Sequence, residues 1–492
     1  MILILAVILP LFIALAISLL GGVASSRQRG RDLLLVGAIA HLLLCALALW
    51  LKNQWSVLTI NGQQWLALDQ FSSTILLLTS ALFVWVAIHC RQWLKSEQQL
   101  RESDLKDLAS RPRPGLLPEW IFLSCLLVFL AAMTLAICST HLGLLWVAIE
   151  ATTLVSAPLI CYHRSAAALE AMWKYLLICS VGIGLALLGT FFIVIAGGGD
   201  SSLNLGTLAA QAESLDPQWS KAAFIFILVG YGTKMGLAPF HTWLPDAHSE
   251  APAPVSALLS AALLNCSFLG ILRFTKIMPS SLHGFCRTLL LALGFLSLAT
   301  AAFFIIRQYD FKRMLAYSSV EHMGLLALLW GCGMNNPTMQ TATMWHLIGH
   351  SLLKMVLFLT AGNILLAYGT RLVNAVKGMF GSTPKNAFLF ITAVLLVCGS
   401  PPSPLFITEL LLVCELGPKG GAVVLLLLLL VLGGMLSAAL RMCMGENTRF
   451  KKDSNSAQMA EELSIVPTII LLLAISFGSA ICIWLAKTNL WQ

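Results

Sequence analysis

Charged side chains are scarce in this chain. Asp, Glu, Lys and Arg make up 11% of its 492 residues, against roughly 25% in an average soluble domain. A soluble protein needs polar groups to cover its surface, and this chain has too few of them. The composition therefore excludes an ordinary cytosolic enzyme, a disordered tail and a nucleic-acid-binding protein, and the net charge of +8 is better explained by membrane topology.

The Cys-x-x-Cys pattern is also missing, although the chain has 13 cysteines. Most of them lie inside apolar runs, where a cysteine acts as a small apolar residue. No residue set has the spacing of an iron–sulfur, haem or zinc site. We therefore expect no cofactor, no metal and no redox centre of the chain's own.

Apolar runs are what the chain has in abundance. Hydrophobic residues make up 58% of it, the mean hydropathy is +0.87, and runs of about 20 residues can cross ~30 Å of hydrocarbon as helices. Residues 1–22 lack a basic region and a small-residue cleavage site, so they are interpreted as a first membrane helix rather than a signal peptide. The pattern predicts an all-α membrane protein. Its 14 predicted spans are residues 2–23, 33–51, 71–90, 120–138, 141–161, 173–196, 222–243, 252–274, 287–306, 315–332, 343–368, 387–413, 421–444 and 464–486.

The positive charges orient these spans. With both termini outside, most of the 30 Lys and Arg residues fall on cytoplasmic connections, as the positive-inside rule requires. The longest such connection, residues 91–119, has mixed charge. It is either a solvated linker or a docking site for a cytoplasmic partner.

Two predicted spans are interrupted by glycine and proline. Span 222–243 contains Gly236 and Pro239, and span 387–413 contains Pro401 and Pro402. Proline removes a backbone donor and breaks a helix, and in a membrane the freed groups must line a cavity. The breaks are five spans apart, which predicts two inverted five-helix repeats, each with a broken helix. Ordinary proline kinks are the alternative.

The repeats divide the chain into four predicted parts. Residues 1–119 form three N-terminal helices and the cytoplasmic connection, and 464–486 form a C-terminal helix. The first repeat covers 120–274 and the second covers 287–444.

Several ionisable residues lie inside the apolar spans, where each charge costs roughly 2.5–3.5 kcal/mol. His346, His350 and Lys354 recur every four residues, so they share one helix face. The pair of histidines lacks the intervening Glu of a metalloprotease motif. The full candidate set for proton transfer is Glu150, Lys174, Lys234, His322, His346, His350, Lys354 and Glu409.

A buried amine that gains and loses contact with a carboxylate can bind and release a proton near neutral pH. Glu150 and Lys234 are candidates for such a pair, and histidines and water could carry the proton onward. Lys174 has an alternative interpretation, as a residue that reaches the membrane surface or pairs with Glu170.

Three segments resemble a known family of membrane proteins. They read KMGLAPFHTWLPDAHSEAPAPVSALLSAALLNCSFLGILRF from Lys234, YDFKRMLAYSSVEHMGLL from Tyr309, and HLIGHSLLKMVLFLTAGNI from His346. The chain is similar over all 14 spans to the antiporter-like subunits of respiratory complex I, Mrp-type antiporters and group 4 membrane hydrogenases. The amino-acid sequence of the first segment is most similar to the hydrogenase-4 component F type.

The resemblance implies a proton-translocating, non-catalytic subunit with two inverted half-channels. Glu150 and Lys234 take the places of the family's paired Glu and Lys, Glu409 takes the place of the exit residue, and the three histidines with Lys354 fall on the central hydrophilic axis. The helix breaks and their surroundings would be supported by Pro239, His241, Asp246, Asn265 and Pro402.

Asn265 departs from the family, because many members have Lys or His at this position. Asn cannot hold a proton at neutral pH, so the link between half-channels would run through water or His322, or the route would be impaired. The alternatives are a subunit of a complex I-like dehydrogenase, an Mrp-type Na⁺/H⁺ antiporter subunit, or a non-conducting structural subunit.

The resemblance also implies a location and partners. The location is the bacterial inner membrane. The partners would be the lipid bilayer, other antiporter-like and quinone-site-type membrane subunits, and a peripheral hydrogenase or dehydrogenase module.

Overall fold

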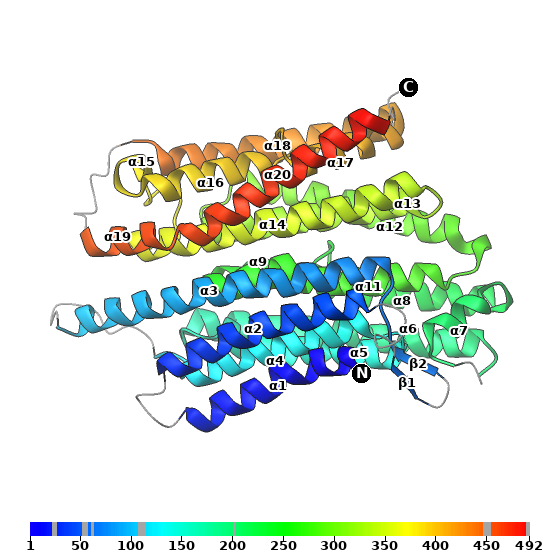
Figure 1. Ribbon diagram of the computed structural model, residues 1–492. Coiled ribbons are helices and arrows are strands. Elements are labelled where there is room, and N and C mark those ends of the chain that lie inside the picture. The colour runs from blue at the N-terminus through cyan, green and yellow to red at the C-terminus, as the bar shows by residue number, and fades with distance from the viewer. Residues whose placement is uncertain are drawn as a thin grey trace. The chain divides into compact units, whose positions relative to one another are not determined.

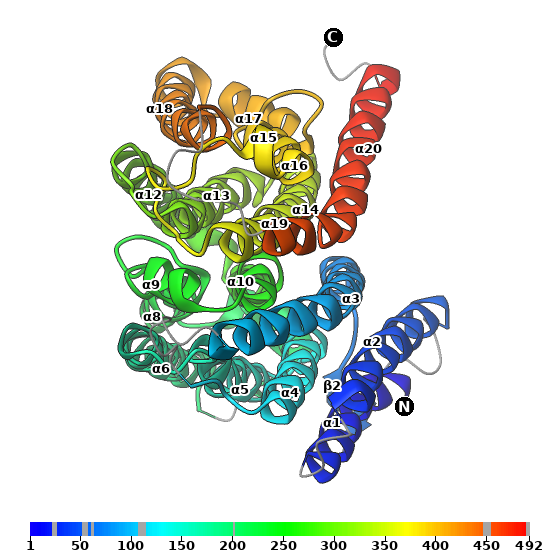
Figure 2. The same ribbon diagram turned by 90° about the vertical axis from the view of Figure 1, so that its left-hand side faces the viewer.

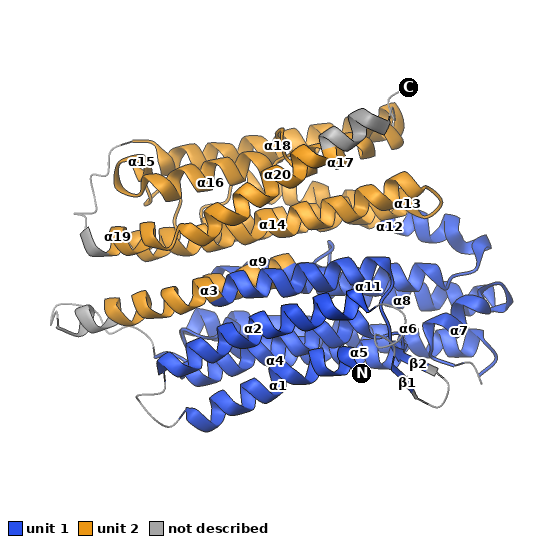
Figure 3. Cartoon of the chain, in the orientation of Figure 1, with its two compact units in different colours: residues 1–87, 114–251, 262–290 blue, residues 88–113, 252–261, 291–492 orange. Residues whose placement is uncertain are grey.

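The computed structural model describes residues 1–21, 27–51, 58–60, 63–106, 115–199, 202–445 and 454–488. Helices account for most of these residues (Figure 1). The one sheet among them is a short antiparallel hairpin, β1 (Leu58–Ile60) and β2 (Gln63–Leu66), which the sequence did not predict. The chain divides into two compact units (Figure 3).

Unit 1 comprises residues 1–87, 114–251 and 262–290. It includes the hairpin and the first part of α3 (Gln70–Lys106), which passes into unit 2 at Ile88. Its other helices are α1 (Ile2–Leu20), α2 (Arg27–Trp50), α4 (Glu119–Cys138), α5 (Leu142–Ile160), α6 (Ala166–Ala196), α7 (Leu205–Ala210), η2 (Ala212–Ser214), α8 (Pro217–Met235), α9 (Trp243–Glu250), α11 (Leu264–Lys276), η4 (Ser280–Leu282) and the start of α12 (His283–Ile305).

Unit 2 comprises residues 88–113, 252–261 and 291–492. In it α14 packs against α10, α13, α16, α17 and α20. Figure 2 shows α10 and α14 nearly end-on, whereas α20 runs obliquely across the view. Besides most of α12, its helices are α10 (Ala253–Leu258), the first part of the π-helical turn η3 (Leu259–Leu263), α13 (Phe311–Gly333), α14 (Pro337–Tyr368), α15 (Met379–Ser382), α16 (Pro384–Val397), α17 (Pro404–Glu415), α18 (Gly417–Cys443), α19 (Ser454–Glu462) and α20 (Ile465–Thr488).

Eleven helical stretches in the described part of the chain are long and apolar enough to cross a membrane. The chain is therefore a multi-pass membrane protein. Eleven of the 14 predicted spans correspond to these stretches. The other three lie at α8, at α13, and at α16 with α17. Helices α16 and α17 have only 14 and 12 residues, and α8 and α13 carry ionisable residues, which lower the mean hydropathy.

Both predicted helix breaks are present and are more than kinks. Helix α8 ends at Met235, and Gly236 follows with a φ of 85°, a left-handed conformation that favours glycine. The chain is then non-helical up to Trp243, where α9 begins. In unit 2 the interruption lies between Val397 and Pro404.

Close packing of α6 against α8 depends on small residues. A methyl group added at Gly230 of α8 would clash with the carbonyl oxygen of Gly182 on α6, and one at Gly182 would clash with the side chain of Thr233. Small residues let the backbones of membrane helices approach closely. This contact brings the end of α8 next to α6, which positions Lys234.

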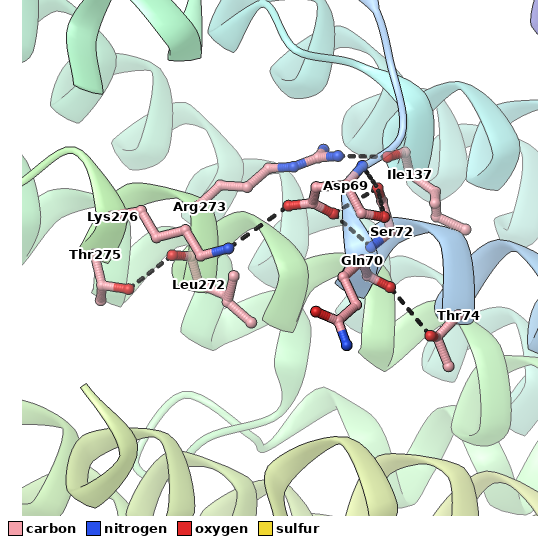
Figure 4. A network of polar contacts seen from close by, with 9 residues as sticks. All are labelled: Asp69, Gln70, Ser72, Thr74, Ile137, Leu272, Arg273, Thr275 and Lys276. Atoms are coloured by element: carbon pink, nitrogen blue, oxygen red, sulfur yellow. Dashed lines mark hydrogen bonds and ion pairs between the residues drawn. The ribbon is translucent and has the colours of Figure 1, made fainter. Parts of the chain in front are cut away.

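A polar network joins the start of α3 to the ends of α4 and α11 (Figure 4). The Asp69 carboxylate accepts hydrogen bonds from the backbone N–H and the hydroxyl of Ser72, at 2.7 and 2.6 Å, and so caps the start of α3. The Lys276 ammonium lies 3.7 Å from the same carboxylate. The buried guanidinium of Arg273 donates to the carbonyl oxygens of Ala136 and Ile137 at the end of α4.

Candidate functional site

Lys234 lies in the last turn of α8 and is fully buried. Its ammonium donates to the Thr153 hydroxyl on α5 at 2.9 Å and to the Tyr175 hydroxyl on α6 at 2.5 Å. Among the described residues it forms no ion pair. A buried amine held only by neutral hydroxyl groups can exist with or without its proton, because no fixed carboxylate contact locks the charge in place.

The hydrogen bonds continue from Tyr175 to α5. The Tyr175 hydroxyl lies 2.6 Å from the Ser156 hydroxyl, and Ser156 donates in turn to the Thr152 carbonyl oxygen, also at 2.6 Å. The Tyr175 ring packs against Trp243, with centroids 5.0 Å apart. Trp243 donates from its indole nitrogen to the Thr233 carbonyl oxygen, where α8 ends.

Glu150 lies on α5, three residues before Thr153. One carboxylate oxygen accepts a hydrogen bond from Ser180 of α6 at 2.7 Å, and the other is buried and has no partner among the described residues. Glu150 makes no direct contact with Lys234 in the described structure. The proposed pair would therefore require a side-chain movement or a bridging water.

Lys174 occupies a different environment from Lys234. Its ammonium pairs with Glu170 at 2.6 Å and with Asp246 of α9 at 3.2 Å, and 46% of its side chain is exposed. This is the ion-paired alternative predicted from the sequence. The pair with Asp246 ties α9 to α6.

Two of the remaining support residues of unit 1 lie in the break, and the third lies on α11. Pro239 and His241 are in the non-helical stretch, and His241 is buried. Asn265 is fully buried on α11.

In unit 2 the histidines of α13 and α14 meet. His322 Nδ1 lies 3.2 Å from His346 Nε2, and the ring centroids of His322 and His350 are 5.2 Å apart. His346 Nδ1 lies 2.8 Å from the Thr408 hydroxyl, which donates to the Leu405 carbonyl oxygen at 2.9 Å. Because the Thr408 hydroxyl donates its hydrogen bond to the Leu405 carbonyl oxygen, its own oxygen accepts from His346 Nδ1–H in the matching tautomer. In neutral His346, Nε2 then accepts from His322.

All three histidines are fully buried. Both ring nitrogens of His350 have no hydrogen-bond partner within the described ranges. Buried polar atoms without partners are costly, and in a membrane protein they point to water or to proton exchange.

Lys354 is also fully buried. Its ammonium donates to the Leu315 carbonyl oxygen at 2.9 Å and to the Ser318 hydroxyl, both on α13. Glu321, on the same helix, is buried and one of its carboxylate oxygens has no partner in the described structure. The arrangement repeats that of Lys234: neutral oxygens hold the amine, and a carboxylate lies on the helix that supplies its hydroxyl partner, without an ion pair in the described structure.

Glu409 lies next to Thr408 on α17 and is buried. Its carboxylate sits against the second helix break: a methyl group added at Gly399, whose φ is 71°, would overlap Glu409 Oε2. Pro402 lies in the same break, and its carbonyl oxygen faces Gly478 of α20 so closely that a side chain there would clash. The break thus makes room for the carboxylate.

Sequence reasoning missed the uncharged members of both networks. Thr153 and Tyr175 accept from Lys234, Ser156 contacts Tyr175, and Thr408 contacts His346. Hydroxyl residues are common in membrane helices and usually bond to their own helix backbone. Their spacing therefore carries no signal that separates these four from the others.

No group of three or more His, Cys, Asp or Glu residues in the described ranges is placed to hold a metal ion. The chemistry that these networks can support is the binding and transfer of protons. Both networks contain amines, and unit 2 adds imidazole rings, whose nitrogens can donate and accept protons.

Comparison with known proteins places this arrangement in a family. Residues 139–437 match the family model described as NADH:quinone oxidoreductase/Mrp antiporter, TM. The chain is 34% identical over 370 residues to a hydrogenase-4 component F homolog from Methylacidiphilum infernorum, which covers 72% of this chain and 75% of that protein. It is 33% identical over 292 residues to one component of a Na⁺/H⁺ antiporter from Alkalihalophilus pseudofirmus, covering 56% of this chain but only 36% of that longer protein.

The fold is also shared with a solved structure. A chain of the membrane-bound sulfane sulfur reductase, an archaeal respiratory membrane complex, superposes with a TM-score of 0.81 at 20% identity, covering 98% of this chain and 95% of that one. The family match spans both breaks and every residue of the candidate proton-transfer set. The chain therefore belongs to the NADH:quinone oxidoreductase/Mrp antiporter transmembrane family.

Proposed function

We propose that this chain is the proton-translocating, antiporter-like membrane subunit of a redox-driven complex of the hydrogenase-4 or formate hydrogenlyase type. The observation that carries the proposal is the state of Lys234 and Lys354. Both amines are fully buried and held by neutral oxygens, without an ion pair in the described structure. Such a group costs too much to keep in a membrane helix for packing alone.

The proposed role of each unit follows from its network. In unit 1, Lys234 exchanges a proton with Glu150, which lies on the neighbouring helix with one oxygen unsatisfied. In unit 2, Lys354, the three histidines and Glu409 carry the proton. Asn265 cannot hold a proton. The proton would therefore pass between the two networks through water or through His322.

The wider arrangement is part of the same proposal. Ten of the 14 spans form two inverted five-helix repeats, 120–274 and 287–444, in a bacterial inner membrane with both termini periplasmic. Other membrane subunits and a peripheral hydrogenase module are the proposed partners, which is supported by the similarity to the hydrogenase-4 component F homolog. The energy would come from those partners.

The test is to measure proton uptake in inverted membrane vesicles that contain the whole complex. Lys234→Ala and Glu150→Ala should each lower donor-driven uptake by about 100-fold, while the complex still assembles. Lys221→Ala, on an exposed face of the same helix, should change it less than about twofold. Normal uptake in both Lys234→Ala and Glu150→Ala vesicles would refute the proposal.

A second candidate is a component of a cation/proton antiporter, which is favoured by the identity with the Na⁺/H⁺ antiporter component from Alkalihalophilus pseudofirmus. It predicts Na⁺- or K⁺-dependent proton flux in vesicles without any electron donor. Co-purification separates the two: a nickel–iron hydrogenase module supports the first function, and small antiporter subunits support the second.

A non-conducting structural subunit is the remaining alternative, and Asn265 is the residue that favours it. In that case neither Lys234→Ala nor Asn265→Lys would alter proton flux. A route bridged by water at Asn265 would instead conduct in the unmodified chain.

A further inference from the structure

The Tyr175 hydroxyl occupies a directed chain of hydrogen bonds. Ser156 donates to the Thr152 carbonyl oxygen, so its oxygen is free to accept from Tyr175. The protonated Lys234 can only donate, so the Tyr175 oxygen accepts from it. The direction therefore runs from Lys234 through Tyr175 and Ser156 to the backbone of α5.

The ring of Tyr175 is held independently of this chain. It packs against Trp243, with ring centroids 5.0 Å apart. The preceding residue, Lys174, pairs with Asp246 on the same short helix as Trp243. Two consecutive residues of α6 are thus fixed to α9.

We propose that Tyr175 is a positioning residue for Lys234. The Tyr175 hydroxyl favours the protonated form of the Lys234 amine and couples that protonation to Ser156. This inference rests on the proposed function of Lys234. When the amine gives up a proton it gains a lone pair, and the Tyr175 hydroxyl turns from Ser156 to donate to it. Tyr175 keeps its own proton throughout, and only the direction of one hydrogen bond changes.

The first variant is Tyr175→Phe, which keeps the ring and its packing on Trp243 and removes the hydroxyl. The protonated amine loses an acceptor, so the pH profile of proton flux should move to lower pH by about one unit. Flux at neutral pH should fall about tenfold. The measurement is donor-driven proton uptake in vesicles containing the complex, between pH 5 and 9.

The matched control is Tyr231→Phe. Tyr231 is also fully buried, lies on the same helix as Lys234, and its hydroxyl has no partner among the described residues. Its flux and pH profile should stay within about twofold and a few tenths of a unit of the unmodified chain. Equal profiles for Tyr175→Phe and Tyr231→Phe would overturn the inference.

Ser156→Ala is a second test of the coupling between Ser156 and Lys234. It should shift the profile in the unmodified chain but add nothing in the Tyr175→Phe background, because Ser156 acts through Tyr175. Additive effects would contradict the coupling. Normal proton flux in the Lys234→Ala variant would instead refute the proposed function. Loss of proton flux in Lys234→Ala, together with normal flux and a normal pH profile in Tyr175→Phe, would refute this inference alone.

Discussion

At the scale of single residues, the lysines of the membrane helices differ in their partners and in their exposure. Lys174 has two carboxylate partners and a half-exposed side chain, so its charge is compensated by direct contact. Lys234 and Lys354 have hydroxyl and carbonyl partners and no exposure. Neutral acceptors stabilise a charge less than a carboxylate does, which leaves these two amines free to lose a proton.

Thr408 provides a test of how the histidines are oriented. Thr408→Val keeps the shape of the side chain but removes the acceptor of His346 Nδ1, which leaves a buried donor unsatisfied at a cost of about 1–3 kcal/mol. The ring should turn away from His322, and proton flux in vesicles should fall. Thr408→Ser keeps the hydroxyl and should retain flux. Full activity in Thr408→Val would show that the orientation of His346 is unimportant.

Asp69 lies outside the membrane-spanning segments and allows a test of how the stability of the fold depends on pH. Burial raises the pKa of its carboxyl, but hydrogen bonds from Ser72 and the nearby charges of Arg273 and Lys276 outweigh burial. The pKa of Asp69 therefore lies below its usual value of 3.8.

A depressed pKa in the folded state adds stability above the unfolded value, and this contribution is lost as the pH falls through the folded value. Asp69→Asn should therefore unfold at a lower temperature than the unmodified chain at pH 7. The two melting curves, measured in detergent, should converge below about pH 4. A difference that stays constant down to pH 3 would mean that the charge of Asp69 contributes nothing.

At the scale of elements, the helix breaks position the ionisable groups. The first break ends α8 directly after Lys234, and Trp243 binds a carbonyl oxygen of the last turn. The second break leaves an open space that the Glu409 carboxylate occupies. An unbroken helix would fill that space with side chains.

Two glycines with nearly the same backbone conformation test this role. Gly399 has a φ of 71° and Gly417 a φ of 70°, so an alanine at either site should cost about 1–2 kcal/mol in backbone strain. Only at Gly399 would the added methyl group displace Glu409, since nothing lies within 4 Å of it at Gly417. Gly399→Ala should lose proton flux in vesicles, and Gly417→Ala should lose stability alone. Equal flux in both variants would contradict the role of the break.

At the scale of the whole molecule, polar contacts join α1 and α2 to α4 within unit 1. Arg31 of α2 forms two hydrogen bonds with Glu119 of α4, at 2.6 and 2.9 Å. The hydroxyls of Ser18 and Ser124 lie 3.0 Å apart, joining α1 to α4. His41 and Thr134 make a third contact at 3.0 Å, between α2 and α4. Polar side chains of this kind hold membrane helices together because lipid offers them no partners.

The proposed orientation can be tested with fusions of alkaline phosphatase, which is active only in the periplasm. A fusion at the C-terminus should be active, and a fusion after Glu462 should be inactive, because the positive charges between α18 and α19 favour the cytoplasm. The opposite pattern would reverse the predicted topology.

The sequence alone determined the class, the family and the two breaks. Apolar length sets membrane crossing, and proline or glycine at Pro239, Gly236 and Pro402 interrupts a helix whatever surrounds it. It also identified the buried ionisable residues, because each is costly in an apolar run. These signals are local, so they can be read along the chain.

Only the tertiary structure decided which partner each ionisable residue contacts. Lys174 and Lys234 look alike in sequence, yet one meets carboxylates and the other meets Tyr175 and Thr153. Glu150 bonds to Ser180 instead of the lysine that the sequence suggested. Side-chain contacts between helices depend on how closely the backbones pack and how each helix is rotated, and neither follows from the residues of one helix alone.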